Sequence, residues 1–107
     1  MPIYNKLVRD RIPEIIIQNG KILQTRRLST LEYQTELRKK LLEEVDEYLD
    51  VNENKAAVEE LADIMELVSA LAKQHDSSIE EVEKVRKKKA QERGAFNDQV
   101  FLESVED

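Results

Sequence analysis

Residues 55–74 constrain the fold most, because their apolar side chains recur at helical spacing around nearly the whole circumference of a helix. At about 100° per residue, one apolar group projects within roughly 60° of Leu61. Its other members are Ala57, Val58, Ile64, Met65, Val68 and Ala72. Leu67 and Leu71 project to a different side. Only a narrow polar stripe is left for solvent, so this helix needs neighbours in more than one direction.

The length of the chain limits how much of this helix one copy can cover. With 107 residues, we expect a single domain over residues 1–107 with a small core. Aromatic residues are few, so that core must be built from Leu, Ile, Val and Ala. We therefore predict that part of residues 55–74 is buried against another subunit and that the protein is not a monomer.

Two acid-x-x-acid pairs stand in the most helical part of the chain. The first is Glu44 with Glu47, and the second is Glu60 with Asp63. Residues three apart share a helix face, where like charges repel, so these pairs do not stabilise their helices locally. One interpretation is a solvated acidic surface. The other is that consecutive helices bring four carboxylates together as a site for a hard divalent cation such as Mg²⁺.

The placement of these acids among apolar residues favours the metal site. Glu60 and Asp63 project at about 260° and 200° from Leu61, beside the second apolar group. Glu44 flanks the apolar stripe of its own helix, and Glu47 lies one step further out. An ionised carboxylate in such a position is costly unless it is paired or binds a metal.

Caps and stop signals divide the chain into helices. Ser29 and Ser78 each precede a Glu by three residues, which is the spacing of a capping box. We predict a short helix up to Gln18, two long antiparallel helices at 31–49 and 55–74, and a further helix at 79–92. Alternating residues predict a short strand at 21–28, and the tail at 96–105 could pair with the N-terminal extended segment. The predicted fold class is all-α, a helical bundle with minor β segments.

The charge and composition of the chain disfavour several classes of function. A net charge of −6 disfavours sequence-independent binding to a nucleic acid polymer or to an anionic membrane. There is no cysteine, which excludes disulfides and zinc–thiolate sites. No stretch has the length and apolarity of a membrane span or a signal peptide, so we expect a cytoplasmic protein.

Basic residues gather near the start of the chain and in the last predicted helix. Lys6 and Arg9 are candidate phosphate ligands, and plain surface residues are the other interpretation. For the run at 86–89 we favour a structural role, because cations complement the dipole at a helix C-terminus. Lys89 and Arg93 are exceptions, and we treat them as candidate phosphate ligands.

The acid pairs and both ends of the chain resemble the MazG-like all-α nucleoside triphosphate pyrophosphohydrolases. That family's pattern is ExxE, a spacer and ExxD, and both acid pairs match it: Glu44-x-x-Glu47 and Glu60-x-x-Asp63. The opening Tyr4–Pro13 and the ending Arg93–Phe96 are similar to a small subgroup related to phosphoribosyl-ATP pyrophosphohydrolase. The resemblance covers nearly the whole chain.

This resemblance implies a homodimer or homotetramer that cleaves nucleoside triphosphates between the α- and β-phosphates. The products would be a nucleoside monophosphate and pyrophosphate. The implied ligands of Mg²⁺, with Mn²⁺ as an alternative, are Glu44, Glu47, Glu60 and Asp63. Glu47 is also the candidate to orient the attacking water. The candidate phosphate ligands are Lys6, Arg9, Lys89 and Arg93.

Two other functions stay open at this point. One is hydrolysis of phosphoribosyl-ATP in histidine biosynthesis. The other is a non-enzymatic module for helical oligomerisation or regulation, in which the acids pair with Arg or Lys across an interface. Stabilisation by metal would separate the enzyme from the module, because a ligand that binds the folded state raises its stability.

Overall fold

The computed structural model describes residues 2–107 and contains four α-helices, with no strand in that range. They are α1 (Ile12–Gln18), α2 (Thr30–Asp50), α3 (Asn54–Gln74) and α4 (Ile79–Arg93). The predicted all-α fold is therefore confirmed, and both long helices continue unbroken through their acid pairs. None of the described helices has the length and apolarity that crossing a membrane requires.

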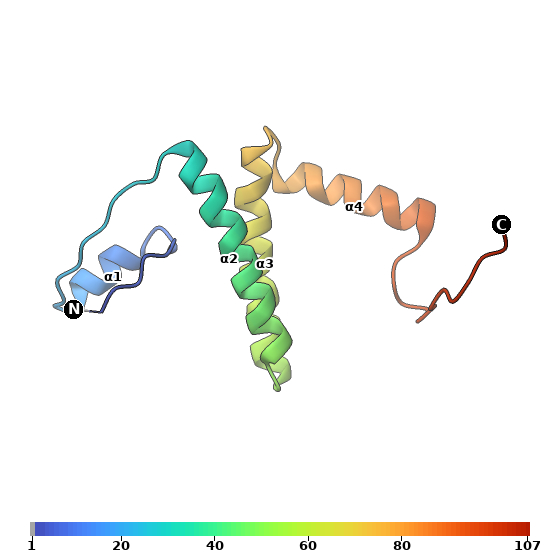
Figure 1. The fold of residues 1–107 in the computed structure, drawn as a ribbon, viewed down its shortest axis with the longest axis horizontal. Coiled ribbons are helices and arrows are strands. Elements are labelled where there is room, and N and C mark those ends of the chain that lie inside the picture. Colours follow the sequence, from blue (N-terminus) through green and yellow to red (C-terminus); the bar gives the residue numbers. More distant parts are fainter. Residues whose placement is uncertain (1) are drawn as a thin grey trace.

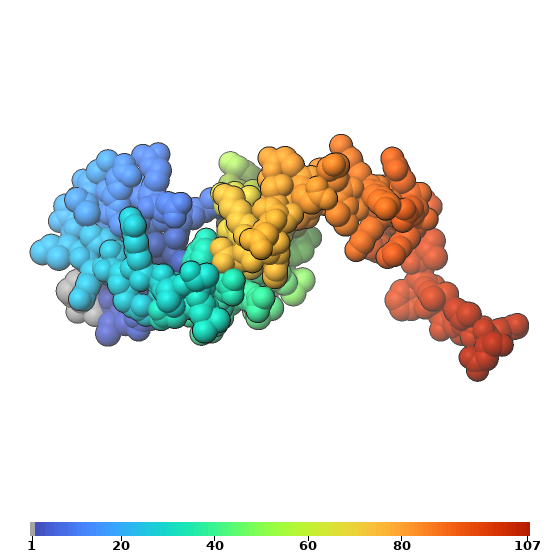
Figure 2. All heavy atoms as spheres, turned by 90° about the horizontal axis from the view of Figure 1, so that it is seen from above, coloured from blue at the N-terminus to red at the C-terminus, as the bar shows by residue number. Residues whose placement is uncertain are grey.

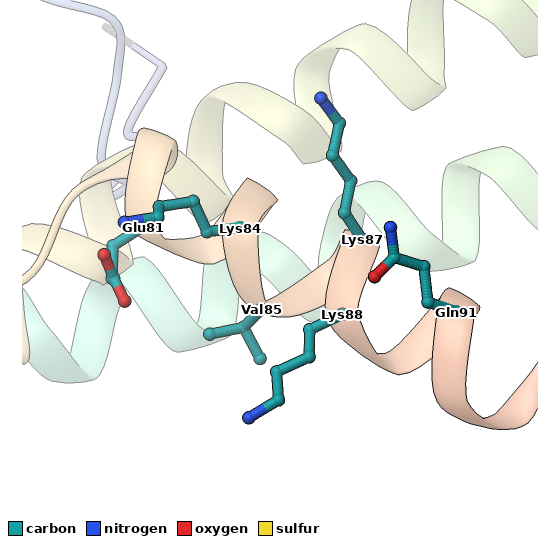
Figure 3. Close-up of a pocket in the computed structure, with 6 residues that line it drawn as sticks. All are labelled: Glu81, Lys84, Val85, Lys87, Lys88 and Gln91. Carbon is teal, nitrogen blue, oxygen red and sulfur yellow. The ribbon is translucent and has the colours of Figure 1, made fainter.

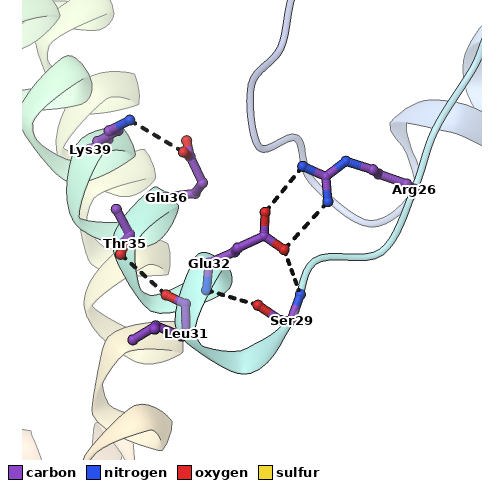
Figure 4. A network of polar contacts seen from close by, with 7 residues as sticks. All are labelled: Arg26, Ser29, Leu31, Glu32, Thr35, Glu36 and Lys39. Carbon is purple, nitrogen blue, oxygen red and sulfur yellow. Dashed lines mark hydrogen bonds and ion pairs between the residues drawn. The ribbon is translucent and has the colours of Figure 1, made fainter.

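The caps predicted from the sequence begin two of these helices. At α2, Ser29 Oγ accepts a hydrogen bond of 3.2 Å from the backbone of Glu32, and the Glu32 carboxylate accepts one of 3.2 Å from the Ser29 backbone. Arg26 also donates to Glu32 from the preceding segment (Figure 4). At α4, Ser78 accepts from the backbone of Glu81, but the Glu81 carboxylate does not bond back to the Ser78 backbone, so only half of the predicted capping box forms. Each bond satisfies a backbone N–H that would otherwise lack a partner in the first turn.

The helices α2 and α3 form an antiparallel hairpin, which is the centre of the molecule (Figure 1). Few side chains are fully enclosed in it. Leu37 and Ala72 are the buried apolar residues among those described, and Glu44 is the buried charged one. The hydrophobic core of one chain is therefore very small.

The rest of the chain lies away from the hairpin. In Figures 1 and 2, α1 and its flanking segments lie on one side of the hairpin, while α4 and the C-terminal tail extend from the other. The radius of gyration is 18.4 Å, whereas a compact domain of this length has a value of about 13 Å. The exposed surface is 10108 Å², against about 6,200 Å² for a compact monomer of this mass.

The predicted β segments are wrong. Residues 21–28 form no strand, and the tail at 96–105 does not pair with the N-terminal segment. A strand needs a partner whose backbone completes its hydrogen bonds. The C-terminal tail and the N-terminal segment lie at opposite ends of the molecule, so neither can serve as a partner for the other (Figure 1).

Candidate metal centre

Three carboxylates converge in the α2–α3 hairpin. Glu44 and Glu47 share a face of α2, and Glu60 reaches the same place from α3. Each offers one oxygen, and these oxygens all lie within 4.8 Å of one another. The i,i+3 spacing and the antiparallel pairing of the two helices together produce the cluster.

Two oxygens of this cluster are buried without a partner. Glu44 is only 7% exposed, and its Oε2 has no hydrogen bond to any described residue. The Oε2 atom of Glu60 is in the same situation. Buried polar atoms of this kind destabilise a fold, by about 1–3 kcal/mol each, unless something else satisfies them.

The environment raises the pKa of two of these carboxyls. For Glu44 the main cause is burial, and the nearby Glu60 carboxyl adds to it. For Glu47 the main cause is again loss of solvation, followed by the neighbouring Glu44. Both causes disfavour the ionised form, and a bound cation would reverse this preference.

Asp63, the fourth predicted ligand, makes a different contact. Its Oδ1 atom lies 2.5 Å from Nη2 of Arg9, so the N-terminal segment is tied to α3 at the edge of the cluster. Both side chains keep solvent access, at 39% for Asp63 and 60% for Arg9. Arg9 is thus beside the carboxylates, as a phosphate ligand would need to be, but it is paired with one of them.

Lys40 is a neighbour of the cluster that the sequence analysis missed. Its Nζ atom lies 3.7 Å from Glu44 Oε1 and 3.6 Å from Glu43 Oε1. The i,i+4 spacing of Lys40 and Glu44 was a usable signal for this pair. Lys40 offsets part of the negative charge, but it leaves the second oxygen of Glu44 unpartnered.

The remaining candidate phosphate ligands are not brought to the cluster within one chain. Lys6 lies over the Tyr4 ring, 5.8 Å from its centroid. Lys89 and Arg93 are exposed on α4, which extends away from the hairpin (Figure 2). The structure therefore pairs Arg9 with Asp63, the fourth acid of the motif, and places Lys89 and Arg93 on a helix that leads away from the cluster.

The cluster has the chemistry of a site for a hard cation. All its donors are carboxylate oxygens, which Mg²⁺ and Mn²⁺ accept as ligands. It contains no Cys or His, which soft or borderline metals prefer. The buried, unpartnered oxygens of Glu44 and Glu60 fit a bound cation better than they fit a solvated acidic surface.

Comparisons of this chain with models of protein families, with curated proteins and with solved structures found no match.

Proposed function

We propose that this protein is a Mg²⁺-dependent nucleoside triphosphate pyrophosphohydrolase, which releases a nucleoside monophosphate and pyrophosphate. The observation that carries the proposal is the convergence of three carboxylates within 4.8 Å, two of them with buried oxygens that lack a partner. The MazG-like spacing of the acid pairs supports the same reaction.

In this proposal Glu44 and Glu60 hold the cation, because their unpartnered oxygens are buried in the hairpin. Bound Mg²⁺ would offset the negative charge of the phosphate oxygens and favour attack at phosphorus. Glu47 is the most exposed of the three acids, so it is the one placed to contact solvent and to orient the attacking water. Asp63 completes the ligand set once its carboxylate leaves Arg9, and Arg9 is then free to bind phosphate.

We also infer that the protein works as a homodimer or homotetramer. A single chain exposes about 3,900 Å² more surface than a compact monomer of its mass. An excess of this size is comparable with the surface that obligate subunit interfaces bury. Sedimentation velocity at micromolar concentration tests this inference, and a 12.5 kDa species would contradict it.

The test of activity is a screen of ordinary and damaged nucleoside triphosphates and phosphoribosyl-ATP, with detection of pyrophosphate. The protein is first stripped of metal and then titrated with Mg²⁺ or Mn²⁺. We expect pyrophosphate release only with metal, and release of orthophosphate instead would contradict the proposal. A product from phosphoribosyl-ATP alone would indicate the biosynthetic enzyme.

Amide variants separate a catalytic cluster from a structural one. Glu47→Gln and Asp63→Asn should abolish or severely reduce turnover while the fold survives. The matched control is Glu43→Gln, because Glu43 is exposed on the same helix and lies outside the cluster. If the site variants melt at lower temperature without metal, yet release pyrophosphate normally, the acids are structural and the non-enzymatic module is correct.

A further inference from the structure

Two segments at opposite ends of the molecule carry opposite charge. Residues 2–28, which we call the N-terminal arm, contain six basic and two acidic residues. Residues 94–107, the C-terminal tail, contain four acidic residues and no basic one. The arm and the tail lie at the two ends of the longest dimension, which measures 61 Å (Figures 1 and 2). The tail of one chain therefore does not meet the arm of that chain.

Much of this charge has no partner within one chain. The acids of the tail make no ion pair with any residue in the range 2–107; they are Asp98, Glu103, Glu106 and Asp107. In the arm, Lys21 and Arg27 also make no ion pair within that range, whereas Arg26 between them pairs with Glu32. The unpaired charges of the two segments are thus of opposite sign.

Both segments also expose large apolar side chains. Ile22 in the arm and Phe101 in the tail are each 87% exposed, and Phe96 is almost completely exposed. Neither residues 21–28 nor residues 94–107 form a helix that could turn these side chains inward. Apolar side chains gathered on an exposed segment are typical of a surface that binds a partner.

The order of charged and apolar residues is the same in both segments when the tail is read backwards. The arm reads KILQTRR from Lys21 to Arg27, and the tail reads ELFVQD from Glu103 to Asp98. Fully extended, the charged ends lie about 20 Å apart in the arm and about 16 Å apart in the tail. Long basic side chains can span this difference. An antiparallel contact would therefore set both basic ends beside acidic ends, with apolar side chains between them.

The basic side of α4 is another surface of suitable charge. Figure 3 shows Lys84, Lys87 and Lys88 around a shallow hollow on this helix. Of the described residues that line the hollow, Val85 alone is apolar. The tail has several large apolar side chains to cover, so the arm, which exposes Ile22 between its basic residues, fits it better.

We propose that the C-terminal tail of one copy docks on the N-terminal arm of a second copy, with the tail acids against the basic residues at 21–27. A second copy is the partner because both complementary surfaces occur on one molecule, at ends that a single chain does not bring together. This contact goes beyond the proposed function and does not depend on the reaction.

Twofold symmetry allows both copies to make this contact. Rotation by 180° about an axis perpendicular to the longest dimension exchanges the two ends of the molecule. The arm of each copy then lies beside the tail of the other, and two equivalent contacts close the dimer. Two chains that each carry a net charge of −6 repel one another overall, and the pairing of basic arms with acidic tails offsets this repulsion locally.

Cysteine crosslinking tests the docking without reference to activity. The native chain has no cysteine, so introduced thiols are the only ones present. One tagged copy carries Ile22→Cys, a differently tagged copy carries Leu102→Cys, and the two are coexpressed and oxidised. We expect a disulfide-linked pair that contains both tags. In the control, Leu42→Cys replaces Ile22→Cys, because Leu42 is an exposed apolar residue of the hairpin, and it should crosslink much less.

Three outcomes of the crosslinking would overturn the docking. One is the absence of a mixed pair. The second is an equal yield with Leu42→Cys, which would mean that the tail meets exposed residues at random. The third is a higher yield when Val85→Cys replaces Ile22→Cys, which would mean that α4 receives the tail.

Reversal of charge tests the pairing of arm and tail. Lys21→Glu and Arg27→Glu, added to the Ile22→Cys copy, should lower the crosslinked yield severalfold, because each exposed pair changes an equilibrium by up to about fivefold. Asp98→Lys and Glu103→Lys, added to the other copy, should restore the yield. As a control, Lys87→Glu and Lys88→Glu on α4 should leave it unchanged. A yield that stays the same after reversal of the arm would overturn the docking by charge.

The result also separates this contact from the other proposals. If no mixed pair forms while sedimentation still shows an oligomer, the docking of the tail is wrong and the inferred oligomer stands. If the mixed pair forms but no triphosphate releases pyrophosphate, the docking stands and the proposed function is wrong.

Discussion

At the scale of single residues, a cation that bound the cluster would compete with protons for the same carboxylate oxygens. The pKa values of Glu44 and Glu47 are raised in the folded protein, mainly by loss of solvation. The folded state therefore holds these protons at a pH where the unfolded chain has already released them. A cation that binds the ionised carboxylates must displace the same protons.

The stability of the metal-free protein should consequently fall as the pH rises. A group whose pKa is raised on folding stabilises the fold below its unfolded pKa, and this stabilisation is lost as the pH passes through the folded value. We expect a higher melting temperature near pH 4.5 than near pH 7 in the absence of metal, with the difference reduced in Glu44→Gln. Saturating Mg²⁺ should remove or invert the slope. The lowered pKa values of Glu32 and Glu83 act in the opposite direction, so the decisive comparison is with Glu44→Gln. A pH dependence that is the same in the wild type and in Glu44→Gln would contradict the assignment of the cluster.

Arg9 should act as a competitor of the metal. Its ion pair with Asp63 occupies a carboxylate of the motif, and an exposed pair of this kind contributes about 0.2–1 kcal/mol. Arg9→Gln should therefore tighten binding of Mn²⁺ up to about fivefold, as measured by electron paramagnetic resonance of the free ion. Arg11→Gln is the control, because Arg11 pairs with Glu14 on α1 instead. Weaker metal binding in Arg9→Gln would show that Arg9 does not compete for Asp63.

At the scale of elements, α2 and α4 each begin at a serine whose side chain accepts a hydrogen bond from the first turn. The α2 capping box holds in both directions, and Arg26 reinforces its Glu32 (Figure 4). This cap matters for the site because α2 carries Glu44 and Glu47 on a single face. Rotation or fraying of α2 would therefore move two carboxylates of the cluster at once.

The loss of this cap should destabilise the hairpin measurably. Ser29→Ala removes the acceptor for the Glu32 N–H, a change that typically costs about 1 kcal/mol. For a domain of this size that corresponds to a fall of roughly 4–8 °C in melting temperature. Thr25→Ala, in the exposed segment before the helix, is the control and should have little effect. If both variants melt like the wild type, the cap does not contribute to the cooperative unit.

At the scale of the whole molecule, the shape of one chain is that of an incomplete domain. Its α4 helix and its C-terminal tail lie away from the hairpin, and large apolar side chains such as Phe96 and Val58 are open to solvent. A chain with so small a core cannot offset the conformational entropy of folding by itself. Assembly should therefore be coupled to folding.

Val58, Leu61 and Met65 form an exposed apolar surface on α3, and a charge placed there should dissociate the proposed assembly. In a monomer, Leu61→Glu would be a surface substitution with an effect within about 0.5 kcal/mol. In an assembly it buries an unpaired carboxylate, so we expect sedimentation as a single chain and a large fall in melting temperature. Lys73→Glu lies in the polar stripe of the same helix and should remain assembled. If Leu61→Glu assembles and melts like the wild type, this apolar surface of α3 is not an interface.

The sequence by itself determined the helices and the motif. Hydrogen bonds in a helix join residues four apart, and caps act within the first turn. Signals such as Ser29 and Ser78 are therefore local, and the predicted helices agree with α2, α3 and α4 to within one residue at each end. The spacing within each acid pair is local in the same sense, so the shared face of Glu44 and Glu47 was predictable.

Only the tertiary structure decided how these elements face one another. Because α3 is apolar on nearly all sides, its sequence does not specify which side meets α2. The structure turns the side of Glu60 toward α2 and leaves Leu61 exposed. That rotation buries oxygens of Glu44 and Glu60 and separates Asp63, which pairs with Arg9, 54 positions away along the chain. The predicted strand at 21–28 failed for the same reason, since β pairing and ion pairing depend on distant partners that no local pattern identifies.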